Sequence, residues 1–518
     1  MARASTHHAT DTVRLAPPHS LWGSTANLPR YSPLGRDTQA DVCIVGAGIA
    51  GLTAAYLLMR AGQTVVVVDD GEIGSGMTGM TTAHLSNAID DRYFEIERLH
   101  GTEGARLAAE SHSAAIEQIA AIVETEEIDC DFERVNGYLF LAPSDEEELL
   151  DRELAAAQRA GLNVDKLARI PLPVERLPGL RFPNQAQFHP LRYLAGVETA
   201  LVRDGGRIFT STHADAVVGG LPATVQAGRH MVSAQAVIVA TNTPINNRFA
   251  IHTKQAPYMT YAIGASVPAG SITQALYWDT QDPYHYVRLQ IARSSRGAQR
   301  HVLIIGGEDH RTGQAADTAE RYGRLEHWAR EHFPHMGKVE FRWAGQVMES
   351  IDGLAFIGRN PLDEANVFIA TGDSGMGMTH GTIAGILLTD LILGRANPWA
   401  ELYDPSRKTL RAVGEFAREA ANTAFQYTDW VTGGDVDSPE DIAAGSGAVI
   451  RCGLGKVAAY RDSNGALHEF EAVCPHLGGI VRWNPAETTW DCPCHGSRFD
   501  ALGKPINGPA NSPLTPIV

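Results

Sequence analysis

The stretch Asp41–Asp70, DVCIVGAGIAGLTAAYLLMRAGQTVVVVDD, decides the fold of the first domain. An apolar run, Val42–Val45, leads into a glycine-rich turn and then into an alanine- and leucine-rich helix. A second apolar run, Val65–Val68, follows the helix and ends at Asp69. This order of strand, helix, strand and acid predicts a complete βαβ unit.

The glycines of the turn indicate what this unit binds. They are Gly46, Gly48 and Gly51, in the spacing GxGxxG. Residues without a side chain allow a tight turn, a close approach of the backbone to a pyrophosphate, and close packing of helix on strand. The helix N-terminus offers N–H groups to the phosphates, and Asp69 is placed to accept hydrogen bonds from a ribose. We therefore expect a dinucleotide, although this stretch does not say which one.

Composition limits the possible partners. The chain has 518 residues, too many for one ordinary core, so we expect about two or three domains. Its formal net charge of −17 repels phosphates and anionic lipid, so we expect neither a nucleic-acid nor a membrane partner. No signal-peptide core and no apolar run of membrane-spanning length is found in the sequence, which leads us to expect a cytoplasmic location.

Local patterns predict the elements that follow. Residues 1–38 indicate an extended arm, residues 92–128 helices, and residues 132–141 a strand. Ser144 and Glu147 have the spacing of a capping box before a charged helix. His189 and Pro190 open another helix, and the apolar run 236–240 before Thr241 is typical of a sheet strand that passes under a cofactor.

The second half of the chain differs from the first in its hydrophobic pattern and aromatic content. Residues 251–345 alternate like strands and are rich in aromatic residues, which predicts a second sheet inserted into the first domain. Residues 372–381 place a strand before a glycine-rich helix start, whose N-terminus favours an electron-rich group. Residues 427–447 have the composition of a linker, and a short all-β pattern follows.

Four of the six cysteines lie in this last part, which points to a metal site. Cys474 and His476 form a C-P-H pair, and Cys492 and His495 form a C-P-C-H pair. Two such pairs suit a structural zinc ion. Their glycine- and proline-rich loops and their spacings favour a Rieske centre instead, in which two thiolates hold one iron of a [2Fe–2S] cluster and two imidazoles the other.

The surrounding segments, HEFEAVCPHLGGIVRWN and WDCPCHGSRFDALGKPINGPA, resemble the Rieske domain. The resemblance implies that Cys474 and Cys492 bind one iron and that His476 and His495 bind the other. The metal group implied here is therefore a [2Fe–2S] cluster.

The same resemblance implies a cluster of modest potential. In many high-potential members the position of Cys494 forms a disulfide with a cysteine of the first loop, but Gly479 stands at that position here. Ser497 matches a serine that can donate to a bridging sulfide, whereas Phe499 stands where a tyrosine hydroxyl often donates. With one donor and the disulfide missing, we expect a reduction potential in the lower half of the Rieske range.

The rest of the chain, from about Trp22 to Gly394, resembles the D-amino-acid-oxidase-like flavoproteins, which include glycine, sarcosine and γ-glutamylputrescine oxidases. The matching segments are VCIVGAGIAGLTAA, GSGMTGMTTAHLS, VIVATNTP, RWAGQ with IDGLAFIG, and TGDSGMGMTHGTIAG. The resemblance implies FAD as the cofactor. The residues expected around FAD are Gly46, Gly48, Ile49, Gly51, Asp69, Thr78, Thr81, Thr82, Ala83, His84, Val217, Thr241, Gly372, Gly377, Met378 and Thr379.

Candidate catalytic residues lie on the expected substrate sheet and beside the flavin. Alternation puts Tyr284, Tyr286 and Arg288 on one face of a strand. A guanidinium beside aromatic rings suits a substrate carboxylate, so we expect these residues to orient the substrate, although either tyrosine alone could equally be a core residue. We expect His84 to contact the flavin, with a proton-accepting or covalent role left open, and Tyr258 to border it.

These observations predict an α/β Rossmann-like FAD-binding domain with an inserted α+β substrate domain, followed by a small all-β Rieske domain. The expected boundaries are 1–37 for an N-terminal arm; 38–95, 180–252 and 345–424 for the FAD-binding domain; 96–179 and 253–344 for the substrate domain; 425–440 for a linker; and 441–518 for the Rieske domain.

The fused arrangement resembles bacterial flavin–Rieske proteins and implies FAD-dependent oxidation of an amine or amino acid to an imine. Electrons would pass from the reduced flavin to the cluster and on to an external protein or small-molecule acceptor. Two alternatives stay open: an oxygen-using amine oxidase with the Rieske domain as redox sensor or structural module, and an electron-transfer flavoprotein that serves a partner oxygenase. The sequence does not decide the substrate, the acceptor or the oligomeric state.

Overall fold

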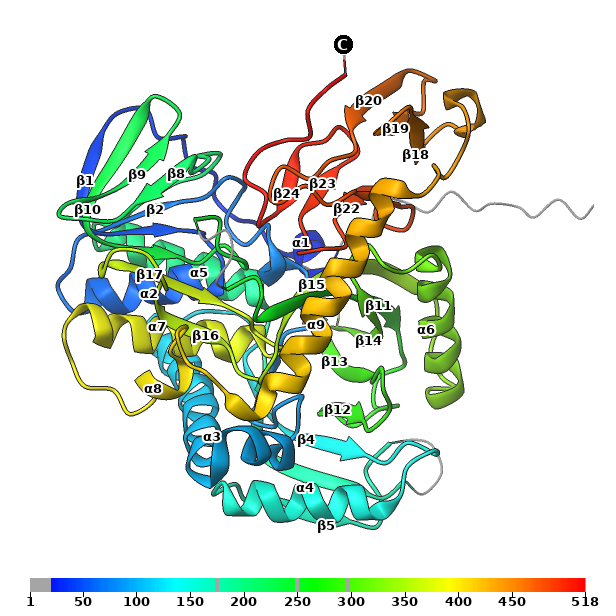
Figure 1. Cartoon of the computed structure of the whole chain (residues 1–518). Coiled ribbons are helices and arrows are strands. Elements are labelled where there is room, and N and C mark those ends of the chain that lie inside the picture. The colour runs from blue at the N-terminus through cyan, green and yellow to red at the C-terminus, as the bar shows by residue number, and fades with distance from the viewer. Residues whose placement is uncertain (1–19, 173–176, 247–250, 294–298, 518) are drawn as a thin grey trace, which may run out of the picture.

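The computed structural model describes residues 20–172, 177–246, 251–293 and 299–517. Its first sheet lies at the upper left of Figure 1 and has the strand order β16-β17-β10-β1-β2-β7, with the pair β8 and β9 attached to β10. The strands are β1 (Thr38–Val45), β2 (Val65–Val68), β7 (Arg207–Phe209), β8 (Ala216–Val218), β9 (Ala223–Ala227), β10 (His230–Val239), β16 (Phe356–Arg359) and β17 (Val367–Thr371).

The central βαβ unit matches the sequence expectation. Strand β1 pairs in parallel with β2 on one side and with β10 on the other. Val65–Val68 is buried along its whole length, as expected for a parallel strand covered on both faces. Helix α2 (Ile49–Arg60) begins directly after the glycine-rich turn. The carboxyl ends of β1, β10 and β17 therefore meet at one edge of the sheet, where ligands bind in such folds.

Helix α7 (Gly377–Ile392) packs closely on α2 because small residues face each other. A β-carbon added at Gly381 would lie 2.7 Å from Ile49, and one added at Gly385 would lie 2.5 Å from Thr53. Larger residues at these glycines would push the helices apart and shift the N-terminus of α7 away from the edge of the sheet.

The second sheet lies at the centre and lower right of Figure 1, in the order β15-β11-β14-β13-β12-β4-β6-β3, with β5 paired to β6. Its strands are β3 (His84–Leu85), β4 (Glu133–Phe140), β5 (Asp165–Leu167), β6 (Gly179–Gln187), β11 (Gln255–Ser266), β12 (Leu276–Asp279), β13 (Tyr286–Arg293), β14 (Gln299–Arg311) and β15 (Val339–Ser350). The sequence analysis assigns residues 180–252 to the cofactor domain, but β6 pairs with β4 and so belongs to this sheet.

The other helices are α1 (Leu21–Thr25), α3 (Tyr93–Thr125), α4 (Glu147–Arg159), α5 (Pro190–Arg203), α6 (Thr318–His332), α8 (Ala400–Tyr403) and α9 (Val413–Gln426), with short 3₁₀ turns η1 (Met77–Gly79), η2 (Leu410–Ala412), η3 (Tyr427–Val431) and η4 (Pro439–Asp441). Among the described residues, no helix combines the length and the apolarity that a membrane span requires.

Two local predictions at helix starts need correction. The capping box at Ser144 and Glu147 does not form, because α4 begins at Glu147 with Glu146 at its N-cap and without a side-chain capping bond. The end of the N-terminal arm is not wholly extended either. It contains α1, and Trp22 is fully buried there, donating from Nε1 to the carbonyl of Thr81. Burial of a large aromatic ring thus fixes this segment against the expected flavin loop.

The C-terminal domain is all-β, as predicted, and lies at the upper right of Figure 1. Its two sheets consist of β18 (Ser446–Cys452), β19 (Gly455–Arg461) and β20 (Leu467–Glu471), and of β21 (Arg482–Asn484), β22 (Thr489–Asp491), β23 (Arg498–Asp500) and β24 (Pro505–Asn507). Their shared core includes Trp490, Phe499 and Phe470.

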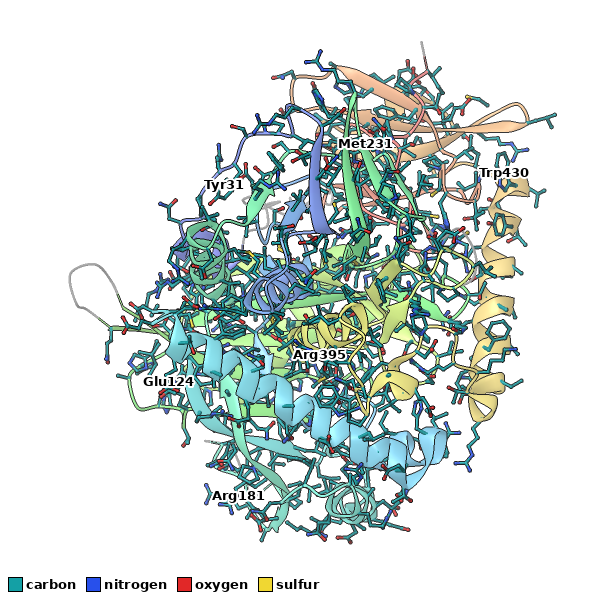
Figure 2. The ribbon with its side chains drawn as sticks, turned by 90° about the vertical axis from the view of Figure 1, so that its left-hand side faces the viewer. Tyr31, Glu124, Arg181, Met231, Arg395 and Trp430 are labelled. Carbon is teal, nitrogen blue, oxygen red and sulfur yellow. The ribbon has the colours of Figure 1, made fainter. Side chains whose placement is uncertain are left out.

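The segment expected to be a linker, residues 425–440, is instead attached to the C-terminal domain. Tyr427 donates from Oη to the carbonyl of Leu477, and Trp430 donates from Nε1 to that of Gly478. Figure 2 shows Trp430 just beyond the end of α9, at the border of the C-terminal domain. Composition alone suggests a flexible tether here, but aromatic side chains with hydrogen-bonding tips anchor it.

Candidate functional site

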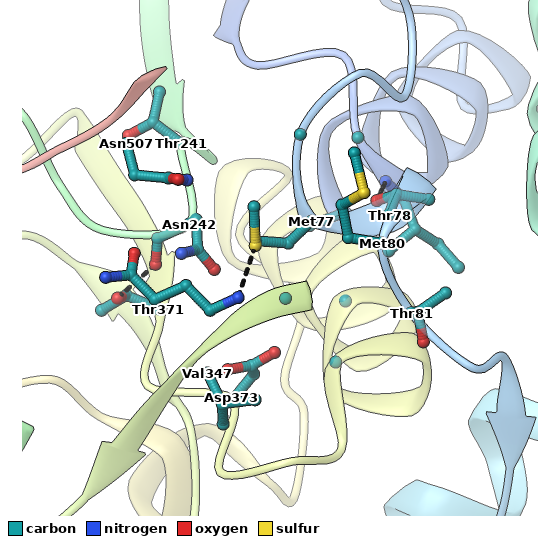
Figure 3. Close-up of a pocket in the computed structure, with 18 of the residues that line it drawn as sticks. Met77, Thr78, Met80, Thr81, Thr241, Asn242, Val347, Thr371, Asp373 and Asn507 are labelled. Carbon is teal, nitrogen blue, oxygen red and sulfur yellow. Dashed lines mark hydrogen bonds between the residues drawn. The ribbon is translucent and has the colours of Figure 1, made fainter. Parts of the chain in front are cut away.

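A cavity of about 610 Å³ opens at the carboxyl edge of the first sheet. Figure 3 shows the segments that enclose it: the loop after β2 with Met77 and Thr78, the loop after β10 with Thr241 and Asn242, and Asn507 of the C-terminal domain. Strand β15 and the start of α7 complete the wall. A cavity with this position and size suits a dinucleotide together with a small substrate.

The glycine-rich turn has no room for side chains. A β-carbon at Gly46, where φ is +113°, would lie 2.3 Å from the carbonyl oxygen of Ala240, and one at Gly51 would lie 1.9 Å from that of Gly46. Asp69 faces the cavity and accepts from the backbone N–H of Ala47 at 2.6 Å. Burial raises the pKa of Asp69, while its amide hydrogen bonds oppose this effect.

Hydrogen bonds fix the predicted flavin loop. Thr78 Oγ1 accepts from the N–H of Ile49 at 3.1 Å, which ties this loop to the first turn of α2. His84 lies 3.0 Å from the hydroxyl of Thr82 through Nδ1. Burial, and next the charge of Arg288, lowers the pKa of His84 to about 3, so its ring is neutral at physiological pH.

The structure brings most of the predicted residues to the cavity. Those that line it are Gly46, Gly48, Ile49, Asp69, Thr78, Thr81, Thr82, His84, Thr241, Tyr284, Tyr286, Gly377 and Met378. Those that lie outside its lining are Gly51, Ala83, Val217, Gly372, Thr379, Arg288 and Tyr258. The individual cofactor contacts stay predictions, whereas two catalytic assignments require correction.

Arg288 does not face the cavity, contrary to the expectation that it binds a substrate carboxylate. Its side chain is fully buried, and Nη1 donates to the carbonyls of Ala83 at 2.8 Å and Phe188 at 3.1 Å. The guanidinium also lies over the ring of Trp22 and donates through Nη2 to Gln290. The alternation pattern does not reveal these partners: Nη1 is used by backbone carbonyls and Nη2 by Gln290, so Arg288 stabilises the flavin loop and does not bind substrate.

Tyr258 is also displaced from its expected place. Its ring lies 5.5 Å from the guanidinium of Arg311, which forms an ion pair with Glu419 of α9. Tyr258 therefore belongs to the contact between the second sheet and α9 and does not line the cavity.

The sequence analysis missed a group of acidic residues in the cavity wall. Asp90, Asp309, Glu349 and Asp373 all line the cavity. Burial is the main cause that raises the pKa of Asp90 and Asp373 to about 6 and that of Asp309 to about 7. Burial and the neighbouring carboxylates raise the pKa of Glu349 well above its usual range. The four acids come from segments far apart in the sequence, so no local motif signals that they converge.

Two buried polar atoms in the lining test whether FAD fits. Gln346 Oε1 and Asn242 Nδ2 have no hydrogen-bond partner among the described residues, and both side chains line the cavity. One is an acceptor and the other a donor, which matches the mixed donors and acceptors of a flavin dinucleotide. Together with the glycine turn, these atoms make the residues compatible with FAD.

The predicted cluster ligands lie in two facing loops. The rings of His476 and His495 have centroids 5.0 Å apart, and Cys474 and Cys492 are buried beside them. In the described part of the chain, no three His, Cys, Asp or Glu side chains converge to hold a single metal ion. All these donors are of the types that a [2Fe–2S] cluster takes in Rieske centres.

The missing disulfide is confirmed. A β-carbon at Gly479 would lie 2.6 Å from Cys494 Sγ, so a cysteine here would be adjacent to Cys494, but glycine leaves that thiol free. Ser497 is fully buried, and its hydroxyl accepts from the N–H of Ala510 at 3.0 Å.

The C-terminal domain docks on the flavin cavity of its own chain. Gln346 of β15 lines the cavity and donates from Nε2 to the carbonyl of Gly496, next to His495, at 2.7 Å. The ring of His252 lies 4.9 Å from that of His476 and 6.3 Å from that of His495, between centroids. The proposed histidine ligands therefore face the wall of the cavity.

Comparisons with known proteins agree with this architecture. A family model described as FAD dependent oxidoreductase matches residues 41–391, and one described as Rieske [2Fe-2S] domain matches residues 434–517. The putative Rieske 2Fe-2S iron-sulfur protein YhfW of Bacillus subtilis (strain 168) is 31% identical over 509 residues, which cover 96% of this chain and 97% of that protein.

More distant relatives match the flavin part. Gamma-glutamylputrescine oxidoreductase of Escherichia coli (strain K12) is 26% identical over 396 residues, covering 73% of this chain and 89% of that protein. The structure of glycine oxidase from Geobacillus kaustophilus aligns with a TM-score of 0.58 at 17% identity, over 72% of this chain and 99% of that one, which shows a shared fold. The chain belongs to the FAD dependent oxidoreductase family, with FAD as its cofactor and a C-terminal Rieske domain that binds a [2Fe–2S] cluster.

Proposed function

We propose that this protein oxidises an amine or amino acid to an imine and passes the two electrons one at a time through its own Rieske cluster to an external acceptor. The observation that carries the proposal is the hydrogen bond from Gln346, which lines the cavity, to Gly496 beside His495, together with the ring contacts of His252 with His476 and His495. Relatives with the same flavin domain include an enzyme named gamma-glutamylputrescine oxidoreductase, which supports an amine-containing substrate.

The chain's own residues prepare both sites. FAD accepts two electrons from a C–H bond next to nitrogen, and the cluster carries single electrons. The glycine turn, Asp69 and the loop around Thr78 would hold the dinucleotide, and Cys474 with Cys492 and His476 with His495 would hold the two irons. Tyr284 and Tyr286 close the substrate side with aromatic surface, which excludes water and positions the substrate.

The relay can be tested by mixing the holoenzyme with candidate amines in a stopped-flow instrument without oxygen. Flavin bleaching should be followed by reduction of the cluster, at a rate that does not depend on protein concentration, because the two sites belong to one chain. Electron paramagnetic resonance of samples frozen during the reaction identifies the reduced cluster independently.

The Cys492→Ser variant is the matched control, because it removes a cluster ligand that lies outside the flavin cavity. It should keep flavin reduction by the amine and lose electron delivery to a one-electron acceptor. Peroxide formation at an unchanged rate in this variant, with no cluster reduction in the wild type, would contradict the relay and favour an oxygen-using oxidase.

A further inference from the structure

We propose that the substrate side of the cavity recognises an amine with a second positive charge, as in a diamine, and not the carboxylate of an amino acid. This proposal names the substrate class of the proposed function and rests on it for the chemistry. The recognition itself is carried by four carboxylates, an unpartnered acidic oxygen and an aromatic wall.

The carboxylates come from four separate elements and converge on one region. Asp90 precedes α3, Asp309 lies on β14, Glu349 on β15, and Asp373 between β17 and α7. Burial is the main cause that disfavours the charge of Glu349, and electrostatic interactions with Asp91 and then with Asp90, Asp373 and Asp309 add to it. Acids that lie this close together in a poorly solvated space favour the uptake of positive charge, either as protons or as a cationic ligand.

These acids have few partners within the protein. Asp90 accepts from the hydroxyl of Tyr284 at 2.7 Å, and Asp373 accepts from the N–H of Met348 at 3.3 Å. Asp309 Oδ1 is buried without a hydrogen-bond partner among the described residues. In the described part of the chain, none of the four forms an ion pair with lysine, arginine or histidine. Within the described residues, the charges of these acids are therefore not compensated by a paired cation of the protein.

The lining supplies little positive charge to bind a carboxylate. Among the described residues that line the cavity, Lys504 is the only lysine or arginine. It belongs to the Rieske domain and acts on Asp70, next to the acid that is expected to bind ribose. Arg288, the expected carboxylate ligand, donates to backbone carbonyls instead. His84 and His380 also line the cavity, and burial lowers their pKa to about 3 and about 4, so neither supplies positive charge. His213 lines the cavity as well, and a hydrogen bond to Asp70 raises its pKa, but its charge is already paired with Asp70.

Aromatic rings complete a site for a cation. The rings of Tyr284 and Tyr286 have centroids 5.3 Å apart, and both line the cavity together with Trp278. The electron-rich face of an aromatic ring attracts an ammonium group, and this attraction strengthens where water is excluded. A protonated alkylamine could therefore pair with carboxylates at its head while its methylenes pack on the rings.

The number of acids in the cavity favours a ligand with two positive charges over a ligand with one. Without a ligand, the acids avoid their mutual repulsion by holding protons, as the raised pKa values of Asp90, Asp309 and Asp373 indicate. A dication replaces these protons and uses more of the acceptors than a monocation does. A substrate carboxylate would add further negative charge to the same space.

A matched series of four-carbon ligands tests this proposal. Butane-1,4-diamine, n-butylamine and 4-aminobutanoate share one ammonium group and four carbon atoms, and at the far end they carry a second ammonium, a methyl group and a carboxylate, respectively. Calorimetric titration into the dithionite-reduced holoenzyme measures binding without turnover. We expect the diamine to bind at least about tenfold more tightly than butylamine, and 4-aminobutanoate to bind no more tightly than butylamine.

Substitutions assign the preference to the acids. Asp309→Asn and Glu349→Gln should each reduce the preference for diamine over butylamine, with FAD content and the cluster spectrum reporting an intact fold. Glu153→Gln is the control, because Glu153 is a buried acid that accepts from the N–H of Tyr93 and lies outside the cavity lining. It should leave the preference unchanged.

The outcomes separate this proposal from the proposed function. Equal binding of 4-aminobutanoate and the diamine, or an unchanged preference in both acid variants, would overturn it even if glycine reduces the flavin. Acid-dependent binding of the diamine without any flavin reduction would support the recognition and contradict amine oxidation.

Discussion

At the scale of single residues, Arg288 shows how one side chain can organise the site without touching the substrate. Its guanidinium donates to the carbonyls of Ala83 and Phe188 and lies over the ring of Trp22. It therefore connects the flavin loop, the residue that follows β6, and α1. Burial lowers the pKa of Arg288 to about 9, so keeping the guanidinium charged inside the protein costs free energy. Hydrogen bonds from Nη1 to these carbonyls offset part of that cost.

Replacing Arg288 with lysine should therefore weaken FAD binding. Lysine keeps the charge but cannot reach several carbonyls at once, and we expect a loss of about 2–4 kcal/mol in the free energy of unfolding. Chemical denaturation and the dissociation constant of FAD measure the two effects. The exposed Arg300→Lys serves as control. A changed amino-acid KM with unchanged FAD affinity would instead restore the substrate role for Arg288.

Asp309 should make stability depend on pH. Burial, and next its interactions with Thr260, Asp90, Arg321 and Asp282, set a folded-state pKa of about 7, above the ordinary value of 3.8. A raised pKa means that the stabilising contribution is complete below the unfolded-state pKa and is lost as pH rises through about 7. Glu349 adds to the effect, because it also interacts with Asp309.

We therefore expect Asp309→Asn to raise the Tm at pH 8 by about 2–4 °C and to change it little at pH 5, where the wild-type acid is largely protonated. Differential scanning calorimetry across this pH range gives the comparison. Asp317→Asn is the contrasting control. Although burial opposes it, pairing with Arg321 and Arg324 lowers the pKa of Asp317, so its loss should destabilise at pH 8. An equal response of both variants would contradict the assignment.

At the scale of elements, the sequence predicted what is encoded locally. The βαβ unit follows from apolar periodicity and glycine spacing within one stretch, and the cluster ligands follow from two short motifs. The acids of the cavity wall come from four elements, so only the tertiary fold brings them together. For Arg288, alternation predicts which face of β13 the side chain lies on. It does not predict that Nη1 donates to the carbonyls of Ala83 and Phe188, because these residues lie far away in the sequence.

Strand β15 is the element that joins the two redox sites. Gln346→Leu removes the hydrogen bond to Gly496 while keeping a side chain of similar size, so it should slow cluster reduction at least about fivefold relative to flavin reduction. Stopped-flow absorbance resolves the two phases. Gln314→Leu is the matched control, because Gln314 Nε2 donates to the carbonyl of Pro493 in the same cluster loop but lies outside the cavity lining. Equal slowing in both variants would point to general loosening of the loop.

At the scale of the whole molecule, the Rieske domain is part of the wall around the cofactor as well as a redox centre. Asp500 and most residues from Lys504 to Asn511 line the cavity. The N-terminal side of this domain is attached through Trp430 to its own cluster loop. The arrangement encloses the expected dinucleotide between two domains of one chain. We therefore expect movement of the Rieske domain away from the first sheet to ease the release of FAD.

Weakening this contact should speed the loss of FAD. Asn511 donates from Nδ2 to the carbonyl of Ala214 at 2.8 Å, and its own carbonyl lies 3.1 Å from His213 Nε2. Asn511→Ala removes the side-chain bond, so the dissociation rate of FAD after dilution should rise by up to about tenfold, as flavin fluorescence can follow. Asn464→Ala, in an exposed turn of the same domain, should leave the rate unchanged. If Asn511→Ala releases FAD no faster than the wild type while the cluster remains loaded, the Rieske domain does not retain the cofactor, and the cavity must open elsewhere.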